Sequence, residues 1–417
     1  MNILIKSATI FDPSSPFHQQ KQDILIEKGF ISKISKTIVN PNNYQEIKLD
    51  NLHVSQGWFD SSVCFGEPGL EERETIANGL KTAAKSGFTA VAVNPNTSPV
   101  ADNKSTIEFI KHQSFGFATN LYPYGSFTKG AQSADLAELY DMQNSGAIAF
   151  GDYNKPISNA NLLKIGLQYA QNFDGLILSF PQDNSIATEG LVNEGINSTK
   201  LGLKGIPSLA EELQIARDLF ILEYTGGKLH IPTISTEKSV KLIKEAKKKG
   251  LNVTCSVAAH HLVLTDDELK SFDSNTKVLP PLRTTKDTKA LLKGLKEGVI
   301  DMITSDHNPI DIEHKKVEYY YAKFGTIGLE SLFGALNKNV DLDVLIASLT
   351  TKPRERFNIE SISINEGNKV NLTLFNPEYE YIFAENNIFS TSKNAVFLNK
   401  KMNGKVYGII ANNRVIL

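Results

Sequence analysis

Eight short apolar segments recur through the middle of the chain, and each is followed by an amphipathic segment or a loop. Strands that alternate with helices form parallel βαβ units, and eight such units close into a barrel. The sequence therefore predicts an α/β protein with a (β/α)8 TIM-type barrel, whose functional site lies at the C-terminal ends of the strands. The candidate strands lie near Gly57–Cys64, Ala90–Val93, Asn120–Tyr124, Ala147–Phe150, Leu176–Phe180, Lys228–Thr233, Asn252–Val257 and Asp301–Ser305.

The two ends of the chain have a different pattern. Residues 1–55 and 365–417 contain short alternating segments that are interrupted by Asn, Gly and Pro, which is typical of strands and turns. We therefore predict that both termini together build one small β-sandwich domain, from residues 1–55 and 365–417, and that residues 56–364 form the barrel.

Composition excludes several classes of protein. Hydrophobic residues make up 41% and charged residues 22% of the 417 residues, and the net charge is −2, so no basic tract for nucleic acid is present. The two cysteines, Cys64 and Cys255, are too few for a disulfide framework. No apolar run reaches the roughly 18 residues that a membrane span needs, and the N-terminus lacks the pattern of a signal peptide. We expect a cytoplasmic protein without nucleic-acid or membrane partners.

Many short motifs occur in one order that is similar to the dihydroorotase family of the amidohydrolase superfamily. They extend over nearly the whole chain, so the resemblance does not depend on any single piece. They are Gly57-Trp-Phe-Asp60, Glu67-Pro-Gly69, Asn94-Pro-Asn-Thr-Ser-Pro99, Asn193-Glu-Gly195, Gly205-Ile-Pro207, His260-His-Leu262, Pro280-Pro-Leu-Arg283, Ser305-Asp-His307, Phe324–Glu330 and Ser392-Lys-Asn394.

The resemblance implies one or two zinc ions, which lower the pKa of a bound water to about 7 and so supply hydroxide. The family's ligands are a His-x-His pair on strand 1, a carbamylated Lys or an Asp on strand 4, one His on each of strands 5 and 6, and an Asp on strand 8. The corresponding positions here are Ser62, Cys64, Asp152, Phe180, Thr233 and Asp306. None of the four imidazoles remains, so we expect the chain to bind no metal.

A displaced metal site is an alternative. Cys64, Asp152 and Asp306 could combine with His260 or His261, which follow strand 7. His230 lies three residues before Thr233, so we expect it to be a packed histidine that points away from the barrel mouth.

The substrate positions that the resemblance implies have changed as well. The Arg that holds the carboxylate of dihydroorotate corresponds to Gly66, and a late His corresponds to Ile310. A further Asn corresponds to Leu279, whereas Asn96 is retained. A guanidinium suits a carboxylate because it offers paired donors, so the change to glycine removes the main countercharge.

These changes predict a dihydroorotase-like protein of pyrimidine biosynthesis that is catalytically inactive, with Asp306 as a retained but non-functional catalytic position. Its role would be that of a scaffold or regulatory subunit, as a homodimer that assembles with aspartate carbamoyltransferase. Two alternatives stay open: an active dihydroorotase or cyclic-amide hydrolase with an atypical metal site, and a barrel repurposed to bind another small molecule.

Overall fold

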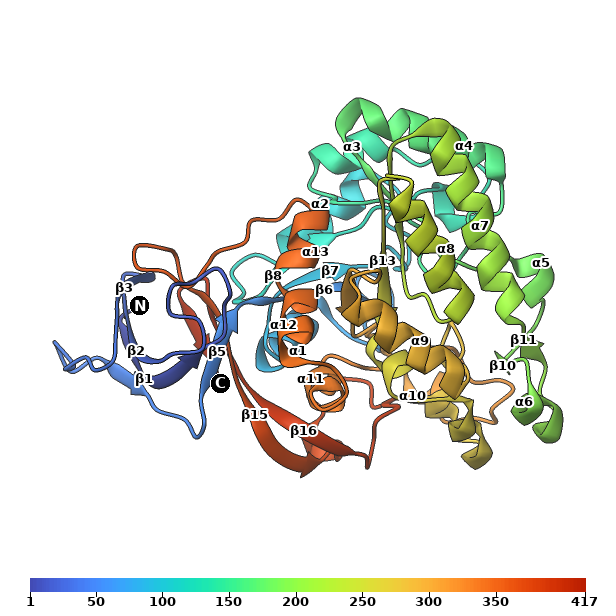
Figure 1. Ribbon diagram of the computed structural model, residues 1–417. Coiled ribbons are helices and arrows are strands. Elements are labelled where there is room, and N and C mark those ends of the chain that lie inside the picture. The colour runs from blue at the N-terminus through green and yellow to red at the C-terminus, as the bar shows by residue number, and fades with distance from the viewer.

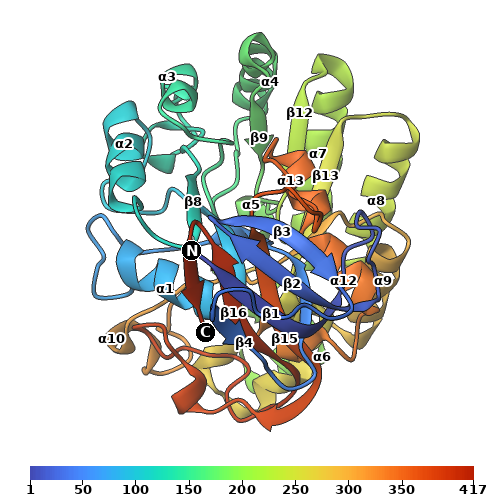
Figure 2. The same ribbon diagram turned by 90° about the vertical axis from the view of Figure 1, so that its left-hand side faces the viewer.

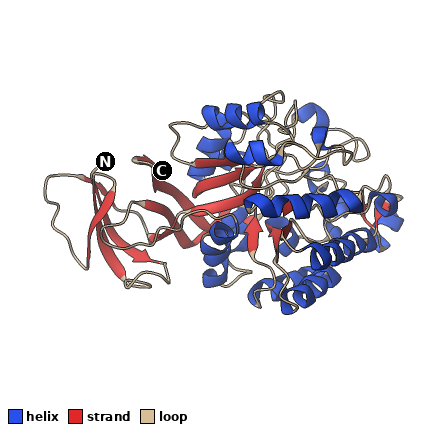
Figure 3. Cartoon of the chain, turned by 90° about the horizontal axis from the view of Figure 1, so that it is seen from above, coloured by secondary structure: helices blue, strands red, loops and turns tan.

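The computed structural model describes all residues from 1 to 417 and divides into a small β domain and a larger barrel surrounded by helices (Figure 1). Both chain termini lie in the β domain. Seen from above, the helices lie around the barrel and the β domain projects from one end (Figure 3).

Seven strands of the barrel are regular, and the fourth is reduced to a bridge. Isolated parallel bridges at Phe150 connect to Gly125 and Ile177, and Val63 pairs with His307, so the parallel sheet closes on itself. The (β/α)8 prediction is therefore confirmed, and Ala147–Phe150 is the one candidate strand that is not continuous. The strands are β6 (Trp58–Val63), β7 (Phe88–Val93), β8 (Asn120–Pro123), β9 (Leu176–Leu178), β12 (Lys228–Ile231), β13 (Val253–Ala258) and β14 (Met302–Thr304).

The helices that cover the barrel begin at residues that cap them. The side chains of Thr75, Thr236 and Thr284 each accept a hydrogen bond from a backbone N–H in the first turn of the following helix. The helices are α1 (Ile76–Lys85), α2 (Lys104–Gln113), α3 (Leu139–Asn144), α4 (Ala160–Ala170), α5 (Asn184–Ala187), α6 (Ile196–Leu201), α7 (Ser208–Thr225), α8 (Glu237–Lys248), α9 (Thr285–Lys296), α10 (Ile312–Lys315), α11 (Leu332–Leu336), α12 (Leu342–Leu349) and α13 (Thr351–Arg356). A two-stranded sheet of β10 (Val192–Asn193) and β11 (Gly205–Ile206) precedes α7.

The β domain is one eight-stranded sheet to which both ends of the chain contribute (Figure 2). Ile31 exchanges backbone hydrogen bonds with Gly367 and Asn368, so the sheet curls back toward its C-terminal strands and encloses its own core of 16 apolar residues. The strands are β1 (Ile3–Ile10), β2 (Lys21–Glu27), β3 (Phe30–Ser35), β4 (Gln45–Ile47), β5 (His53–Gln56), β15 (Asn371–Ile382), β16 (Lys401–Ala411) and β17 (Arg414–Ile416).

The main core lies between the barrel and its helices and comprises 54 buried apolar residues. None of the helices is both long enough and apolar enough to cross a bilayer. The barrel is thus a rigid frame whose strand ends, at the C-terminal side, position the side chains considered next.

Candidate functional site

The candidate site lies at the mouth of the barrel. It is formed at the C-terminal ends of β6, β12 and β14 and beside the loop that follows Phe150. Ser62, Cys64, Phe180, Thr233 and Asp306 are all buried there. Thr233 and Asp306 both adopt a left-handed backbone with φ near +49°. This conformation is rare for residues other than glycine and persists only where the surrounding structure holds it. The strand ends are therefore tightly constrained.

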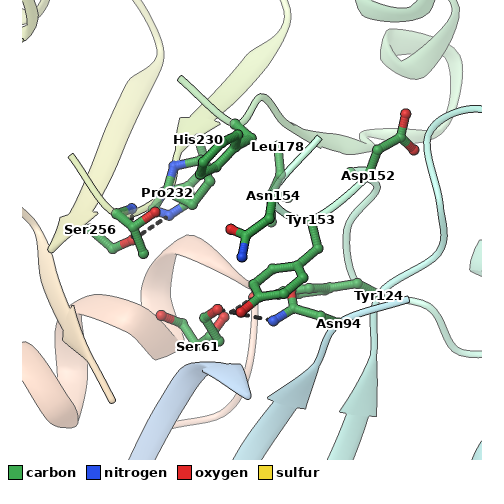
Figure 4. A pocket seen from close by; sticks show the side chains of 14 residues that line it. Ser61, Asn94, Tyr124, Asp152, Tyr153, Asn154, Leu178, His230, Pro232 and Ser256 are labelled. Atoms are coloured by element: carbon green, nitrogen blue, oxygen red, sulfur yellow. Dashed lines mark hydrogen bonds between the residues drawn. The ribbon is translucent and has the colours of Figure 1, made fainter. Parts of the chain in front are cut away.

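A tyrosine closes the mouth. The Tyr153 hydroxyl donates to Asp306 Oδ1 at 3.2 Å, and the Ser62 hydroxyl lies 3.5 Å from the same oxygen. Asn94 Nδ2 donates to Ser62 Oγ at 3.0 Å and lies 3.6 Å from Cys64 Sγ. In Figure 4 the Tyr153 ring lies across the pocket toward Ser61 and Asn94. Four elements of the barrel thus meet in one hydrogen-bonded network.

Asp152 does not belong to this network, contrary to the prediction that it occupies the bridging ligand position. Its Oδ1 accepts from Ser126 Oγ at 2.7 Å and from the Thr128 N–H at 2.9 Å, and its Oδ2 accepts from Thr128 Oγ1 at 2.5 Å. Figure 4 shows its carboxylate turned away from the labelled side chains around Tyr153. Asp152 fastens the loop after β8, and Tyr153 is the residue of this segment that faces Asp306.

Apolar side chains pack around Phe180 at the mouth. Phe180 is 3% exposed and belongs to one buried cluster with Leu279, Ile206, Ala187 and Ala210. Phe180 stands at a predicted ligand position and Leu279 at a predicted substrate position. A predicted ligand position and a predicted substrate position therefore lie in the same apolar cluster.

Burial shapes the charges of the mouth. Desolvation raises the pKa of Asp306 to about 8, and the nearby Asp60 carboxyl acts in the same direction, while the Tyr153 and Ser62 hydrogen bonds oppose it. Burial also raises the pKa of the Cys64 thiol to about 12. Asp60 accepts hydrogen bonds from the N–H groups of Ser62 and Ser305, so it ties β6 to the segment after β14.

The histidines considered as ligands, His230, His260 and His261, are buried but do not gather around a common point. His230 was expected to point away from the mouth, and this is wrong, because it lines the same pocket as Tyr153 (Figure 4). Its ring nitrogens bond Thr254 Oγ1 at 2.9 Å and Ser256 Oγ at 3.2 Å, and burial holds its pKa well below 6.5. His261 bonds the Pro280 carbonyl at 3.0 Å.

The side chains present do not fit the zinc ion that the resemblance implies. No group of three or more His, Cys, Asp and Glu side chains is arranged to hold a metal, so Cys64, Asp152, Asp306, His260 and His261 do not form the displaced site considered above. Structural and catalytic zinc sites use imidazole, thiolate and carboxylate ligands in a tetrahedral set. Here the positions around Asp306 carry hydroxyls, a protonated thiol and aromatic rings.

None of the predicted substrate positions carries a charged side chain. A Cβ atom at Gly66 would stand 1.8 Å from the Leu70 carbonyl oxygen, so the loop after β6 admits no side chain there. Ile310 is 3% exposed and its N–H donates to Asn394 Oδ1. Asn96 is half-buried, and its side-chain oxygen has no hydrogen-bond partner.

Sequence reasoning missed Tyr153, Asn94 and the place of His230. Tyr153 directly follows Asp152, the residue that the sequence pattern indicates at the end of strand 4. Asn94 stands at the end of β7 inside the motif Asn94–Pro99, where a polar side chain after a buried strand points to the mouth of a barrel.

Comparisons with known proteins agree with this architecture. A family model described as "Dihydro-orotase-like" matches residues 53–239. The chain is 38% identical to a dihydroorotase of Pelotomaculum thermopropionicum and 35% identical to one of Geotalea daltonii, in both cases over 100% of this chain and 99% of the relative. Among solved structures, an L-hydantoinase (dihydropyrimidinase) from Arthrobacter aurescens superposes with a TM-score of 0.85 over 100% of this chain and 97% of the other, at 19% identity, which supports the fold. Full-length identity of this degree shows that the chain belongs to the dihydroorotase-like family of the amidohydrolase superfamily.

Proposed function

We propose that this chain is a dihydroorotase-like protein of pyrimidine biosynthesis that does not hydrolyse dihydroorotate and that acts as a scaffold or regulatory subunit. One observation carries the proposal: the mouth of the barrel is filled by the protein's own side chains. The cavity that remains between Tyr153, Phe180 and Ser256 has a volume of about 20 Å³. A cavity of this size holds roughly one water molecule.

The side chains that fill the mouth do not suit the reaction of the family. A ligand ring and a substrate-binding amide have been replaced by Phe180 and Leu279, which belong to one buried apolar cluster. To admit a polar ring and a metal ion, the protein would have to expose this cluster and break the hydrogen bond from Tyr153 to Asp306. Burying a charged ligand among apolar side chains that offer it no hydrogen bond is unfavourable, so the packed mouth is the stable state.

Recognition of the substrate carboxylate is affected as well. Gly66 is held between hydrogen bonds to Glu74 and Leu70, and the close Leu70 carbonyl leaves no room for a side chain that could carry a guanidinium. The loss therefore extends to the backbone of the loop. A single substitution to arginine would not restore the countercharge.

An active dihydroorotase with an atypical site is the second candidate, and the names of the relatives favour it. All the relatives compared above at 35–38% identity are called dihydroorotase. This candidate requires that the barrel mouth opens in solution and that a metal is held without the four histidines of the family's ligand set. The third candidate, a barrel repurposed for another small molecule, is favoured by a groove of about 800 Å³ beside α10, which lies outside the filled mouth.

An assay separates these candidates. The purified chain would be incubated with dihydroorotate and carbamoyl aspartate in both directions, with and without added zinc, beside the Pelotomaculum thermopropionicum relative as a positive control. We expect no conversion above the uncatalysed rate with this chain. Turnover that rises with added zinc and disappears with a chelator would instead establish the active candidate.

The proposed partner is aspartate carbamoyltransferase, because some members of the family assemble with it. The retained segments 324–330 and 392–394 bond each other inside the protein, for example through Thr326 Oγ1 and the Asn394 carbonyl, so they maintain the barrel rather than form a docking surface. Affinity purification of the tagged chain from its native host should recover the carbamoyltransferase. If the carbamoyltransferase is abundant, fully active and absent from the purified sample, the scaffold proposal fails.

A further inference from the structure

A groove outside the barrel mouth lies where the barrel meets the β domain. It is lined by α1 of the barrel and β17 of the β domain and has a volume of about 440 Å³, which is within the range of small-molecule sites. Figure 2 shows α1 beside β16 and the C-terminal end of the chain. The loop of residues 116–118 and Phe389 complete the lining. Four segments that are far apart in sequence therefore meet around this groove.

One part of the groove is apolar. Ala84 and Ala118 are buried and belong to one apolar cluster, against which Ile416 packs. The two alanines leave a hollow that larger side chains would fill. Phe117 is half-buried and Phe389 is 44% exposed, so both rings contribute accessible aromatic surface. This part of the groove suits a flat apolar ring, which packs favourably against aromatic side chains.

Every charged side chain that lines the groove is a cation. Lys81, Lys85 and Arg414 line it, and no Asp or Glu does. Lys81 and Lys85 are four residues apart on α1 and share one face of this helix. Arg414 and Ile416 are two residues apart on β17, so both face the same side of the sheet. All three cations are exposed and none forms a salt bridge, although Lys85 Nζ lies 4.3 Å from the centre of the Phe389 ring. The groove thus concentrates positive charge in a chain whose net charge is −2.

Another groove, beside α8 and α9, shows that this lack of partners is specific. It also contains three lysines, but carboxylates line it as well. Each lysine is paired, Lys238 with Glu212 at 3.6 Å, and both Lys241 and Lys286 with Glu237 at 2.8 and 2.7 Å. The cations of the groove between α1 and β17 have no such partner in the chain, and an anionic ligand would supply one.

We propose that the α1/β17 groove, defined by Lys81, Lys85, Phe117, Phe389 and Arg414, binds a nucleoside phosphate. The phosphate group is held by the three cations, and the base packs against the aromatic and apolar side chains. The inference goes beyond the proposed function, because it holds whether or not the chain hydrolyses dihydroorotate.

A phosphate matches the three cations better than a carboxylate does. A phosphate monoester carries about 1.5 to 2 negative charges near pH 7 and has three acceptor oxygens, two of which can pair with one guanidinium. A carboxylate carries a single charge and would leave two of the cations without a partner. Free inorganic phosphate would leave the apolar part of the groove in contact with water. A phosphate that is attached to a flat ring therefore fits both parts of the groove at once.

Isothermal titration calorimetry of the full-length chain with uridine monophosphate and with adenosine monophosphate tests the proposal. We expect binding of a nucleotide, and binding of uridine alone or inorganic phosphate alone that is weaker by about 10-fold or more, because each offers only half of the contacts. Lys81→Met and Arg414→Gln should each raise the dissociation constant of the nucleotide about 10-fold, since each removes a hydrogen bond between charged groups. Lys289→Met is the matched control, because Lys289 is also an exposed helical lysine without a salt bridge but lies on α9.

Fluorescence locates the bound nucleotide independently. The wild type has one tryptophan, Trp58, which is fully buried. The emission of the indole introduced by Phe389→Trp should change as the nucleotide binds, with the dissociation constant that calorimetry gives. The indole introduced by Tyr321→Trp, at a 70% exposed position in the loop after α10, should not respond.

Three results would overturn the proposal. The first is that neither nucleotide binds at millimolar concentration. The second is a dissociation constant that Lys81→Met and Arg414→Gln leave unchanged, or an equal affinity for inorganic phosphate alone, which would indicate adventitious anion binding. The third comes from a titration with hexaglutamate: if this peptide binds and the nucleotides do not, the groove takes an acidic protein segment instead.

Discussion

The Tyr153 hydroxyl donates a hydrogen bond to Asp306 across the mouth of the barrel, from the loop after Phe150 to the end of β14. This contact places a phenol beside a buried carboxyl, where the family resemblance implies a metal. Tyr153→Phe removes the hydroxyl and should lower the free energy of unfolding by about 1 kcal/mol.

A double-mutant cycle with Asp306→Ala assigns that loss to the pair. In the Asp306→Ala background, Tyr153→Phe should have almost no effect on the urea midpoint. Equal losses in both backgrounds would mean that Tyr153 acts through other contacts.

The purified protein should contain no stoichiometric zinc. The physical reason is that Ser62, Phe180 and Thr233 offer two neutral hydroxyls and a phenyl ring in place of imidazoles. Elemental analysis after dialysis against a weak chelator measures this directly, with the Pelotomaculum thermopropionicum relative prepared in parallel. One or two zinc ions per chain that survive dialysis would contradict it.

Asp152→Asn should destabilise the protein and leave its metal content unchanged. The carboxylate accepts from three donors of Ser126 and Thr128, so an amide NH2 in its place would face a donor and leave it unsatisfied. We expect a loss of about 1–3 kcal/mol in urea unfolding. Asp141→Asn, at an exposed position in α3, is the control and should change stability by less than about 0.5 kcal/mol. A variant that unfolds like the wild type would show that these hydrogen bonds contribute nothing.

The buried histidines His261 and His307 should contribute less to stability as the pH falls below about 6.5, whereas the raised pKa of Asp306 acts in the opposite direction. Burial lowers the pKa of His307 to about 3 and that of His261 to about 4, from 6.5. Between these values the unfolded chain binds protons that the folded chain does not, so acid favours unfolding by up to about 1.4 kcal/mol per pH unit for each group.

Urea unfolding at pH 7.5, 6.0 and 5.0 measures the slope of the free energy of unfolding against pH. His307 Nδ1 accepts the Gly328 N–H at 3.2 Å, and His307→Asn supplies an amide oxygen in a similar place without a titrating ring. This variant should have a shallower slope, whereas His112→Gln, at an exposed position of α2, should retain the slope of the wild type. Identical slopes in all three proteins would rule out His307 as a contributor.

The order of strands and helices could be predicted from the sequence, because buried parallel strands are continuous apolar runs with amphipathic segments between them. The direction of side chains beyond the strand ends could not. Phe150 forms only isolated bridges, so the alternation of a regular strand does not continue to residues 152 and 153. An offset of one residue reverses which side chain faces the mouth, and for this reason the sequence pattern indicates Asp152 where the structure has Tyr153.

The same limit applies to His230 and Gly66. His230 lies on β12, but its place in the pocket depends on the hydroxyls of Thr254 and Ser256 on the adjacent strand β13, which are far away in sequence. The sequence alone shows that glycine stands at position 66, where the family resemblance implies an arginine. The Leu70 carbonyl that now occupies the space was visible only in three dimensions.

The shared sheet of the β domain has a consequence for synthesis on the ribosome. β5 ends at Gln56 and pairs with β15, which begins at Asn371, so roughly 300 residues are made between the two partners. At 5–20 residues per second this takes about 15–60 s. During that time the first strands emerge with an unpaired edge that could join another nascent chain. The sheet of the β domain therefore cannot be completed until the C-terminal strands have been made, which makes this domain the last part of the protein to finish folding.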